Sequence, residues 1–218
     1  EINGLHTDNF RGQVYWAEGN GPGSNIYRSD INNFNPEYLT SLPALVKEMH
    51  VCRDTNIIFL KGYNKIYKYS NSTISVISAS NFYPNYFAID ELNQRIFTHG
   101  YQNVNNLIRS TDYSGQFLAQ HTYSTDVYDM DCDYNGNLYV SSINGIDFYD
   151  FDNQIESTLF DLSQFSLAPY VWRLTYVSDV NPYFIFLNAS SNSLISNGII
   201  DGGINKVNVD GSGFQSLF

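Results

Sequence analysis

The chain has 218 residues, of which 15% are charged and 16% are aromatic, and its formal net charge is −11. The aromatic content argues against a disordered chain, and the scattered Lys and Arg residues argue against nucleic-acid binding, which needs clustered positive charge. The sequence has no run of roughly 18 apolar residues, so no segment is predicted to span a membrane.

A unit of four short strands repeats five times along the chain. An apolar-aromatic pair marks the second strand of each unit, and successive pairs are 38 to 47 residues apart. The pairs are Tyr15-Trp16, Ile58-Phe59, Ile96-Phe97, Leu138-Tyr139 and Ile185-Phe186. Periods of about 40–50 residues are typical of propeller blades.

Each unit begins with a strand that ends in an acidic or small polar residue. These first strands are predicted at 5–8, 51–54, 88–90, 130–133 and 174–178. A tight polar turn leads into the second strand, and Asn135-Gly136 is the clearest because a type I′ hairpin needs positive φ at both central residues. The third strands are predicted at 26–29, 66–69, 107–110, 146–149 and 204–209, and the fourth at 38–42, 74–77, 117–121, 155–160 and 214–218.

The alternation of apolar and polar residues within these segments is typical of strands. A four-stranded sheet cannot bury its apolar face alone, and radial stacking of such sheets covers it. We therefore predict one all-β domain over 1–218, a β-propeller of five four-stranded blades at about 1–46, 47–81, 82–124, 125–168 and 169–218. The alternatives are a six-bladed propeller with one blade missing from this chain, and a β-sandwich.

Three segments resemble the YWTD repeat of LDL-receptor-type propellers. Tyr15-Trp16-Ala17-Glu18 is followed by a third strand at 26–30, and the segment 93–99 is followed by one at 108–115. The last unit ends its third strand in Asp210-Gly211, as that family does. The resemblance implies an extracellular propeller that binds proteins and does not catalyse a reaction.

The segment 129–137 carries the densest set of acidic and amide side chains. Asp131, Asp133, Asn135 and Gly136 match the first ligand positions of an EF-hand loop, although Ser142 stands where that loop has its bidentate Glu. One interpretation is a Ca²⁺ site made by Asp129, Asp131, Asp133 and Asn135. The other is a hairpin turn between a first and a second strand. We predict no other cofactor.

First strands line the axis of a propeller, so His6 and His50 are candidates for side chains in a central channel. With Asp129 and Asp131 they would hold a metal ion that activates water, as in lactonase-type propellers, or they would hydrogen-bond to one another. An error of one residue in strand register would turn each side chain to the other face.

The sequence has two sequons and two cysteines, and neither pair by itself is evidence of secretion. Asn71-Ser72-Thr73 and Asn188-Ala189-Ser190 are acceptor sequences for N-glycosylation. Cys52 and Cys132 lie in first strands of units that are not neighbours, so we expect two buried thiols and no disulfide.

We predict a secreted, non-catalytic propeller that binds protein or glycan through Tyr and Asn side chains. A second hypothesis is a repeating subunit of an extracellular fibre or coat that self-associates into filaments. A third is a metal-dependent hydrolase that uses the channel. No nucleophile–base set is visible in the sequence, and we expect no catalysis.

Overall fold

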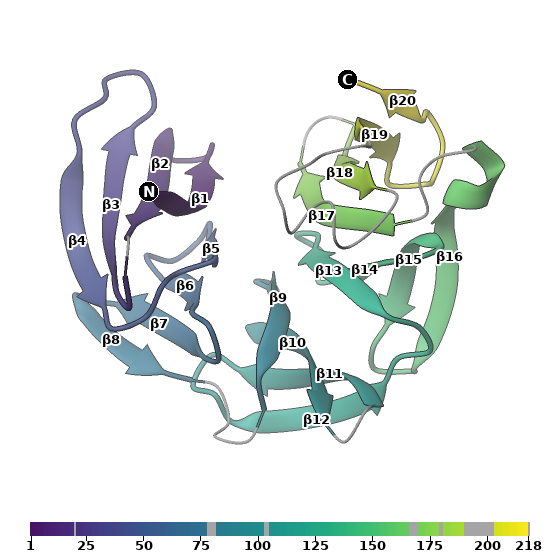
Figure 1. Cartoon of the computed structure of the whole chain (residues 1–218), viewed down its shortest axis with the longest axis horizontal. Helices are drawn as coiled ribbons and strands as arrows, with labels where there is room; N and C mark the ends of the chain where they lie inside the picture. Colours follow the sequence, from purple (N-terminus) through teal and green to yellow (C-terminus); the bar gives the residue numbers. More distant parts are fainter. Residues whose placement is uncertain are drawn as a thin grey trace. The chain divides into compact units, whose positions relative to one another are not determined.

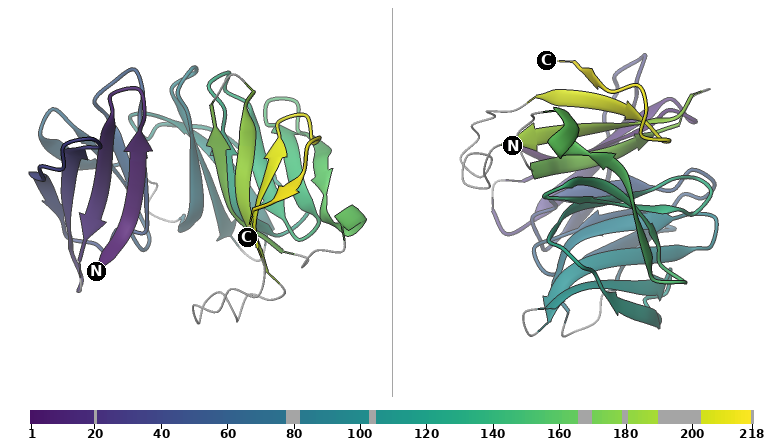
Figure 2. Two further views of the ribbon diagram at one scale, coloured as in Figure 1. Left: turned by 90° about the horizontal axis from the view of Figure 1, so that it is seen from above. Right: turned by 90° about the vertical axis from the view of Figure 1, so that its right-hand side faces the viewer.

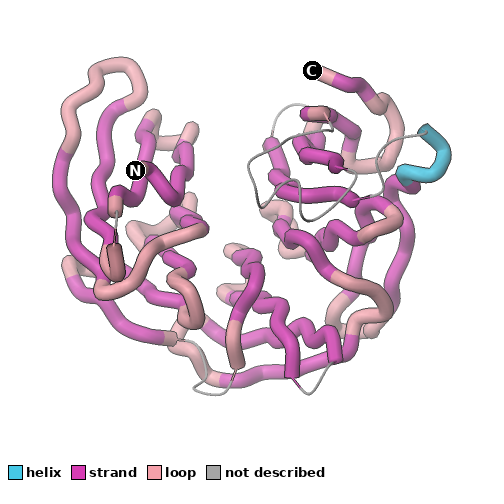
Figure 3. Tube along the Cα trace, viewed as in Figure 1, coloured by secondary structure: helices cyan, strands magenta, loops and turns pink. Residues whose placement is uncertain are grey.

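The computed structural model describes residues 1–19, 21–77, 82–102, 105–165, 170–178, 181–189 and 203–217. In these residues twenty strands form five four-stranded antiparallel sheets, and the one helix is the 3₁₀ turn η1 (Leu162–Phe165) (Figure 3). This is the five-bladed all-β architecture that the sequence predicts. No helix in the described ranges has the length and apolar content needed to cross a membrane.

Each sheet is a meander whose strands pair in chain order, and we number the sheets as blades 1 to 5 (Figures 1 and 2). Blade 1 contains β1 (Ile2–Asp8), β2 (Gln13–Glu18), β3 (Ser24–Asp30) and β4 (Glu37–Leu42). Blade 2 contains β5 (Glu48–Val51), β6 (Ile58–Lys61), β7 (Ile66–Ser70) and β8 (Thr73–Val76). Blade 3 contains β9 (Pro84–Asp90), β10 (Arg95–Gln102), β11 (Asn105–Asp112) and β12 (Phe117–Thr122). Blade 4 contains β13 (Val127–Cys132), β14 (Leu138–Ser142), β15 (Gly145–Asp150) and β16 (Ile155–Asp161). Blade 5 contains β17 (Tyr170–Val177), β18 (Tyr183–Ala189), β19 (Ile204–Asn208) and β20 (Gln215–Ser216).

The chain divides into two compact units. Unit 1 comprises 1–85 and 112–116, and therefore holds blades 1 and 2 with the tip of the β11–β12 hairpin. Unit 2 comprises 86–111 and 117–218, and holds most of blade 3 with blades 4 and 5.

The core of unit 1 lies between blades 1 and 2. Tyr15 and Ala17 of β2 pack in one buried cluster with Ile58 and Leu60 of β6. Because successive side chains on a strand point to opposite faces, the residue between them, Trp16, lies on the other face of blade 1.

Unit 2 has two core layers, one on each side of blade 4. Leu138 and Val140 of β14 pack with Phe97 of blade 3, whereas Tyr139 packs with Phe184 of blade 5. The alternation along a single strand therefore joins three blades.

The predicted first strand at 51–54 is wrong at all but its first residue, because β5 ends at Val51. The amide of Cys52 donates to the carbonyl of Ile57 and closes the hairpin there, so the turn starts earlier than the sequence indicates. His50 then lies opposite Phe59, as His6 lies opposite Tyr15. Tyr15 therefore corresponds in position to Phe59. The matching of the apolar-aromatic pairs in the sequence places it opposite Ile58, one residue earlier.

In the part of the chain that the structure describes, a buried aspartate holds the turn between the first and second strands of blades 1, 3 and 4. Each carboxylate is shielded from water but accepts hydrogen bonds from backbone amides of its own turn, which compensate for the lost hydration. The donor–acceptor pairs include Arg11 to Asp8 (3.0 Å), Asn93 to Asp90 (2.9 Å) and Asn135 to Asp133 (2.9 Å).

Blade 2 has Cys52 at the position of this aspartate, and Arg11 of blade 1 stabilises its turn. The Arg11 guanidinium binds the Asp8 carboxylate and donates to the carbonyls of Cys52 (3.2 Å), Arg53 (2.6 Å) and Thr55 (2.8 Å). The Arg11 guanidinium thus links two blades. Its planar shape and fixed set of N–H donors allow it to bind several acceptors at once.

We expect Arg11→Lys to lower the free energy of unfolding of unit 1 by about 1–3 kcal/mol, because an ammonium cannot reach all these carbonyls and the carboxylate at once. The measurement is a urea titration. Arg28→Lys is the matched control, since Arg28 pairs with Glu37 on the surface and exposed ion pairs contribute little. Equal effects of the two substitutions would contradict the role given to Arg11.

Candidate functional site

The strongest candidate for a binding surface is a set of exposed side chains on adjoining turns of unit 2. Leu92 lies in the β9–β10 turn and Tyr134 in the β13–β14 turn, and both are exposed. The two turns touch, because a Cβ placed on Gly136 would lie only 2.7 Å from Asp90 Oδ1. Tyr176 of β17 adds a ring in edge contact with Tyr134, at 5.9 Å between centroids. We call Leu92, Tyr134 and Tyr176 the turn surface.

Buried carboxylates make the turn surface rigid and negative. Asp133 accepts hydrogen bonds from the Asn137 amide nitrogen (2.8 Å) and the Tyr139 hydroxyl (3.2 Å). Burial raises the pKa of the Tyr176 hydroxyl, and the charge of Asp133 adds to the shift. The phenol is therefore a neutral donor and acceptor for any partner that contacts it.

One cation lies beside this surface and is already paired. Arg95 Nε donates to Asp90 Oδ2 at 2.9 Å, and its Nη1 donates to the exposed Asp152 at 2.8 Å. This ion-paired set ties the β9–β10 turn to the β15–β16 turn. Exposed apolar groups on turns fixed in this way lose little conformational entropy when a partner binds.

The predicted calcium residues lie together in sequence, but the structure directs their carboxylates to different partners. Asp129 accepts from the Leu174 amide (3.0 Å) and Asp131 from the Tyr176 amide (2.8 Å), so both bind the first strand of blade 5. Asp133 binds the amides of its own turn, including that of Asn135. Among the described residues, these acids do not bring three ligand atoms within 4.8 Å of one another. The arrangement fits the hairpin-turn interpretation, and calcium binding stays a prediction.

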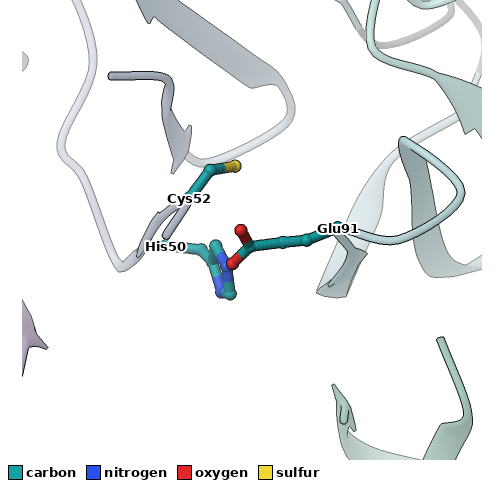
Figure 4. Close-up of side chains that lie close together, drawn as sticks. All are labelled: His50, Cys52 and Glu91. Atoms are coloured by element: carbon teal, nitrogen blue, oxygen red, sulfur yellow. The ribbon is translucent and has the colours of Figure 1, made fainter. Parts of the chain in front are cut away.

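The channel candidates His6 and His50 are brought together in unit 1. They lie on β1 and β5, with their rings 5.2 Å apart between centroids. Burial lowers the pKa of His6 to about 3, and the neighbouring His50 lowers it further. His50 lies on β5, and Cys52 follows the end of that strand (Figure 4).

Cys52 and Cys132 are buried free thiols, as the sequence predicts. Cys52 Sγ lies 3.6 Å from the Tyr113 hydroxyl. Burial raises the pKa of Cys132 well above its ordinary value, with the charge of Asp131 as the next contribution. A thiol that stays protonated is a poor nucleophile and a poor metal ligand.

The two sequons differ in accessibility. Asn71 is exposed at the tip of the β7–β8 hairpin. Asn188 is only 3% exposed, and its amide oxygen accepts from Asn205 Nδ2 at 2.7 Å. In the folded chain, Asn71 is open to modification and the Asn188 amide is closed to it.

Sequence reasoning missed the turn surface. Leu92 and Tyr134 follow a capping aspartate by one or two residues, and this position relative to Asp90 and Asp133 is the signal that was available. Tyr176 could not be found in this way, because it reaches the surface through the packing of blade 5 on blade 4.

Comparison with solved structures identifies the architecture. A chain of the crystal structure of a nidogen/laminin complex has a TM-score of 0.69 and 13% identity, over 100% of this chain and 78% of that one. TolB from Acinetobacter baumannii has a TM-score of 0.72 and 16% identity, over 98% of this chain and 54% of its own. The fold is a β-propeller.

A third propeller match is the extracellular domain of a one-component system from B. thetaiotaomicron, with a TM-score of 0.58 and 16% identity over 84% of this chain and 26% of that chain. No protein-family model and no curated protein matches the sequence. Identities this low show the fold alone. The chain spans about half the length of TolB and about three quarters of the nidogen/laminin chain.

The half-buried His6 predicts an acid-sensitive propeller. The folded-state pKa of His6 is about 3, below the unfolded value near 6.5. Between these two pH values, the imidazole is protonated in the unfolded chain and neutral in the folded chain. The free energy of unfolding should then fall as the pH drops below about 6.5, by on the order of 3 kcal/mol at pH 4.

His6→Gln removes this contribution. Thermal unfolding of the wild type and of His6→Gln, at a pH of about 7 and of about 4, measures it. The variant should lose less stability on acidification than the wild type does. Parallel losses in the two proteins would show that His6 is not the group responsible.

Proposed function

We propose that this chain is a non-catalytic, protein-binding β-propeller of the YWTD type that acts outside the cell, with the turn surface as its contact site. The observation that carries the proposal is the group of exposed apolar and aromatic side chains on two touching, aspartate-held turns of unit 2. Tyrosine is enriched at interfaces because it combines contact area with a hydrogen-bonding hydroxyl.

The setting of the turn surface indicates the partner's chemistry. The chain carries a net charge of −11, and the capping acids Asp90 and Asp133 hold the turns that carry Leu92 and Tyr134. An apolar patch with basic residues around it would complement both features, and the charges would steer it toward the site.

The hydrogen bonds that two aspartates of blade 4 already accept favour binding over catalysis. Asp129 and Asp131 accept from backbone amides of blade 5. These hydrogen bonds take up acceptor capacity that a metal ion or an abstracted proton would also need.

The comparisons support the extracellular and protein-binding parts of the proposal. One matched structure is a nidogen/laminin complex and another is an extracellular domain. The repeat Tyr15-Trp16-Ala17-Glu18 and the accessible sequon at Asn71 are consistent with such a setting.

Glycosylation at Asn71 is the first expected outcome. In a secretory eukaryotic host, intact mass and peptide mapping should find glycan on Asn71 and none on Asn188, because the Asn188 amide is buried and bonded. Asn71→Gln should remove the added mass, and Asn188→Gln should leave it unchanged. Glycan on Asn188, or none at either site, would contradict this prediction.

The second expected outcome is that a partner binds through the turn surface. A partner captured from the extracellular fluid of the source is purified, and its Kd is measured against variants. Leu92→Ala and Tyr134→Ala should each weaken binding by about tenfold, the effect of truncating an interface anchor. Tyr63→Ala is the control, because Tyr63 is also exposed but lies on the β6–β7 turn of unit 1. An unchanged Kd for both turn-surface variants would overturn the assignment.

A further inference from the structure

The first strands of blades 1 and 2 bring two histidines and a cysteine together in unit 1. His6 lies on β1 and His50 on β5, and Cys52 follows the last residue of β5. The ligand atoms of His50 and Cys52 lie within 4.8 Å of each other (Figure 4). All three residues belong to unit 1, so their proximity does not depend on where unit 2 lies.

The spacing of these side chains fits the bond lengths of an ion that binds both imidazole and thiolate. In a tetrahedral site such an ion holds nitrogen at about 2.0–2.1 Å and sulfur at about 2.3 Å. Two imidazoles on one ion then have ring centres roughly 5 Å apart, and the His6 and His50 rings are 5.2 Å apart. A nitrogen and a sulfur on the same ion are roughly 3.5 Å apart, so His50 and Cys52 need to approach by little more than about 1 Å.

The backbone holds one of the two imidazoles as it holds histidines that bind metals. His6 donates a hydrogen bond to the backbone carbonyl of Met49, on the neighbouring first strand. A neutral imidazole that donates from one nitrogen carries a lone pair on the other. Outer-shell carbonyls fix the rings of metal ligands in the same way. His6 can therefore bind an ion without giving up this hydrogen bond.

The thiol of Cys52 has a hydroxyl beside it. Tyr113 Oη lies 3.6 Å from Cys52 Sγ, and the Tyr113 ring packs on Phe59 with 4.8 Å between the centroids. Tyr113 belongs to the tip of the β11–β12 hairpin that lies in unit 1. When a metal ion displaces the thiol proton, the hydroxyl can donate to the thiolate and stabilise its charge.

We propose that His6, His50 and Cys52 form a binding site for a transition-metal ion that accepts both imidazole and thiolate, which is Zn²⁺ or Cu⁺. Tyr113 is the outer-shell donor to the sulfur. The thiol proton passes to solvent as the ion binds. The ion joins β1 to β5, and so adds a second link between blades 1 and 2 to the one that Arg11 makes.

This site differs from the metal site that the sequence suggests. Cys52 takes the place of Asp129 and Asp131, whose carboxylates bind backbone amides of blade 5. The residues also differ from those of the turn surface, so the inference does not depend on the proposed binding function.

Cobalt binding to the full chain tests the ligand set. The protein is freed of metal under reducing conditions and titrated with Co²⁺, whose bond to a thiolate gives a charge-transfer band in the near ultraviolet. The band should saturate at one equivalent and disappear in Cys52→Ser. It should remain in Cys132→Ser, the matched control, because Cys132 is the other buried cysteine and lies on β13. A band that Cys132→Ser abolishes and Cys52→Ser leaves intact would overturn the assignment.

Competition distinguishes the two ions. Displacement of Co²⁺ gives the Kd for Zn²⁺, and anaerobic competition with a coloured Cu⁺ chelator gives the Kd for Cu⁺. The ion that binds with the lower Kd is the occupant. A Kd above about 10 µM for both ions would overturn the proposal.

The histidines are tested by the loss of affinity. His6→Gln and His50→Gln should each weaken binding by more than about 100-fold, since loss of an outer-shell partner alone weakens it by about 10- to 100-fold. Tyr113→Phe should weaken binding by about 10-fold and keep the ring on Phe59. His121→Gln, on β12 in blade 3, should bind as the wild type does. An unchanged Kd in both His6→Gln and His50→Gln would overturn the site.

Measurements on the wild type replace any variant that fails to fold. X-ray absorption should find one sulfur and two imidazole nitrogens bound to the ion, and a shell of nitrogen and oxygen alone would overturn the role of Cys52. The ion at about 100 times its Kd should raise the Tm by roughly 5–10 °C. A Tm that the ion leaves unchanged would overturn the link between blades 1 and 2.

Discussion

The buried carboxylate at the end of a first strand is the interaction on which the arrangement of these blades depends. Asp8, Asp90 and Asp133 each give up solvent, and backbone amides of the adjoining turn replace the lost hydrogen bonds. A buried charge is tolerated only with such complete compensation. The turn must therefore adopt one conformation, and the two strands it joins are held in one register. That register decides which alternate side chains face the preceding blade and which face the following one.

Blade 2 shows what happens where the carboxylate is absent. Cys52 has no carboxylate, and Arg11 reaches across from blade 1 to donate to the turn's carbonyls, that of Cys52 included. The same guanidinium is held by Asp8, so one aspartate organises its own turn and, through the arginine, the next. The aspartate that caps a turn in blade 1 therefore also stabilises the contact of blade 1 with blade 2. In blade 4 the acids Asp129 and Asp131 act in the same direction, from one first strand to the next.

The sequence was sufficient to predict the repeat, the four strands of each blade and the buried thiols, because alternation and spacing are local properties. The sequence was insufficient to predict which face of a sheet each side chain occupies. Tyr15 and Ile58 occupy similar places in the pattern, yet pairing across the hairpin makes Tyr15 correspond to Phe59. The difference arises where Cys52 closes its turn, which depends on hydrogen bonds and not on composition. The spacing of Asp131, Asp133 and Asn135 matched a calcium loop for a similar reason: spacing does not say whether a carboxylate will meet a cation or the amide of a neighbouring strand.

The same limit explains why binding surfaces are hard to read from a repeat sequence. Leu5, Met49, Met130 and Leu174 are equivalent apolar residues at equivalent positions, and nothing in their local sequence separates the exposed one from the three buried ones. The three buried residues are covered by the preceding blade, a property of neighbours that local sequence does not show. In a fold whose stability comes from blade-on-blade contact, a binding surface and an internally packed surface can therefore carry the same pattern of apolar residues.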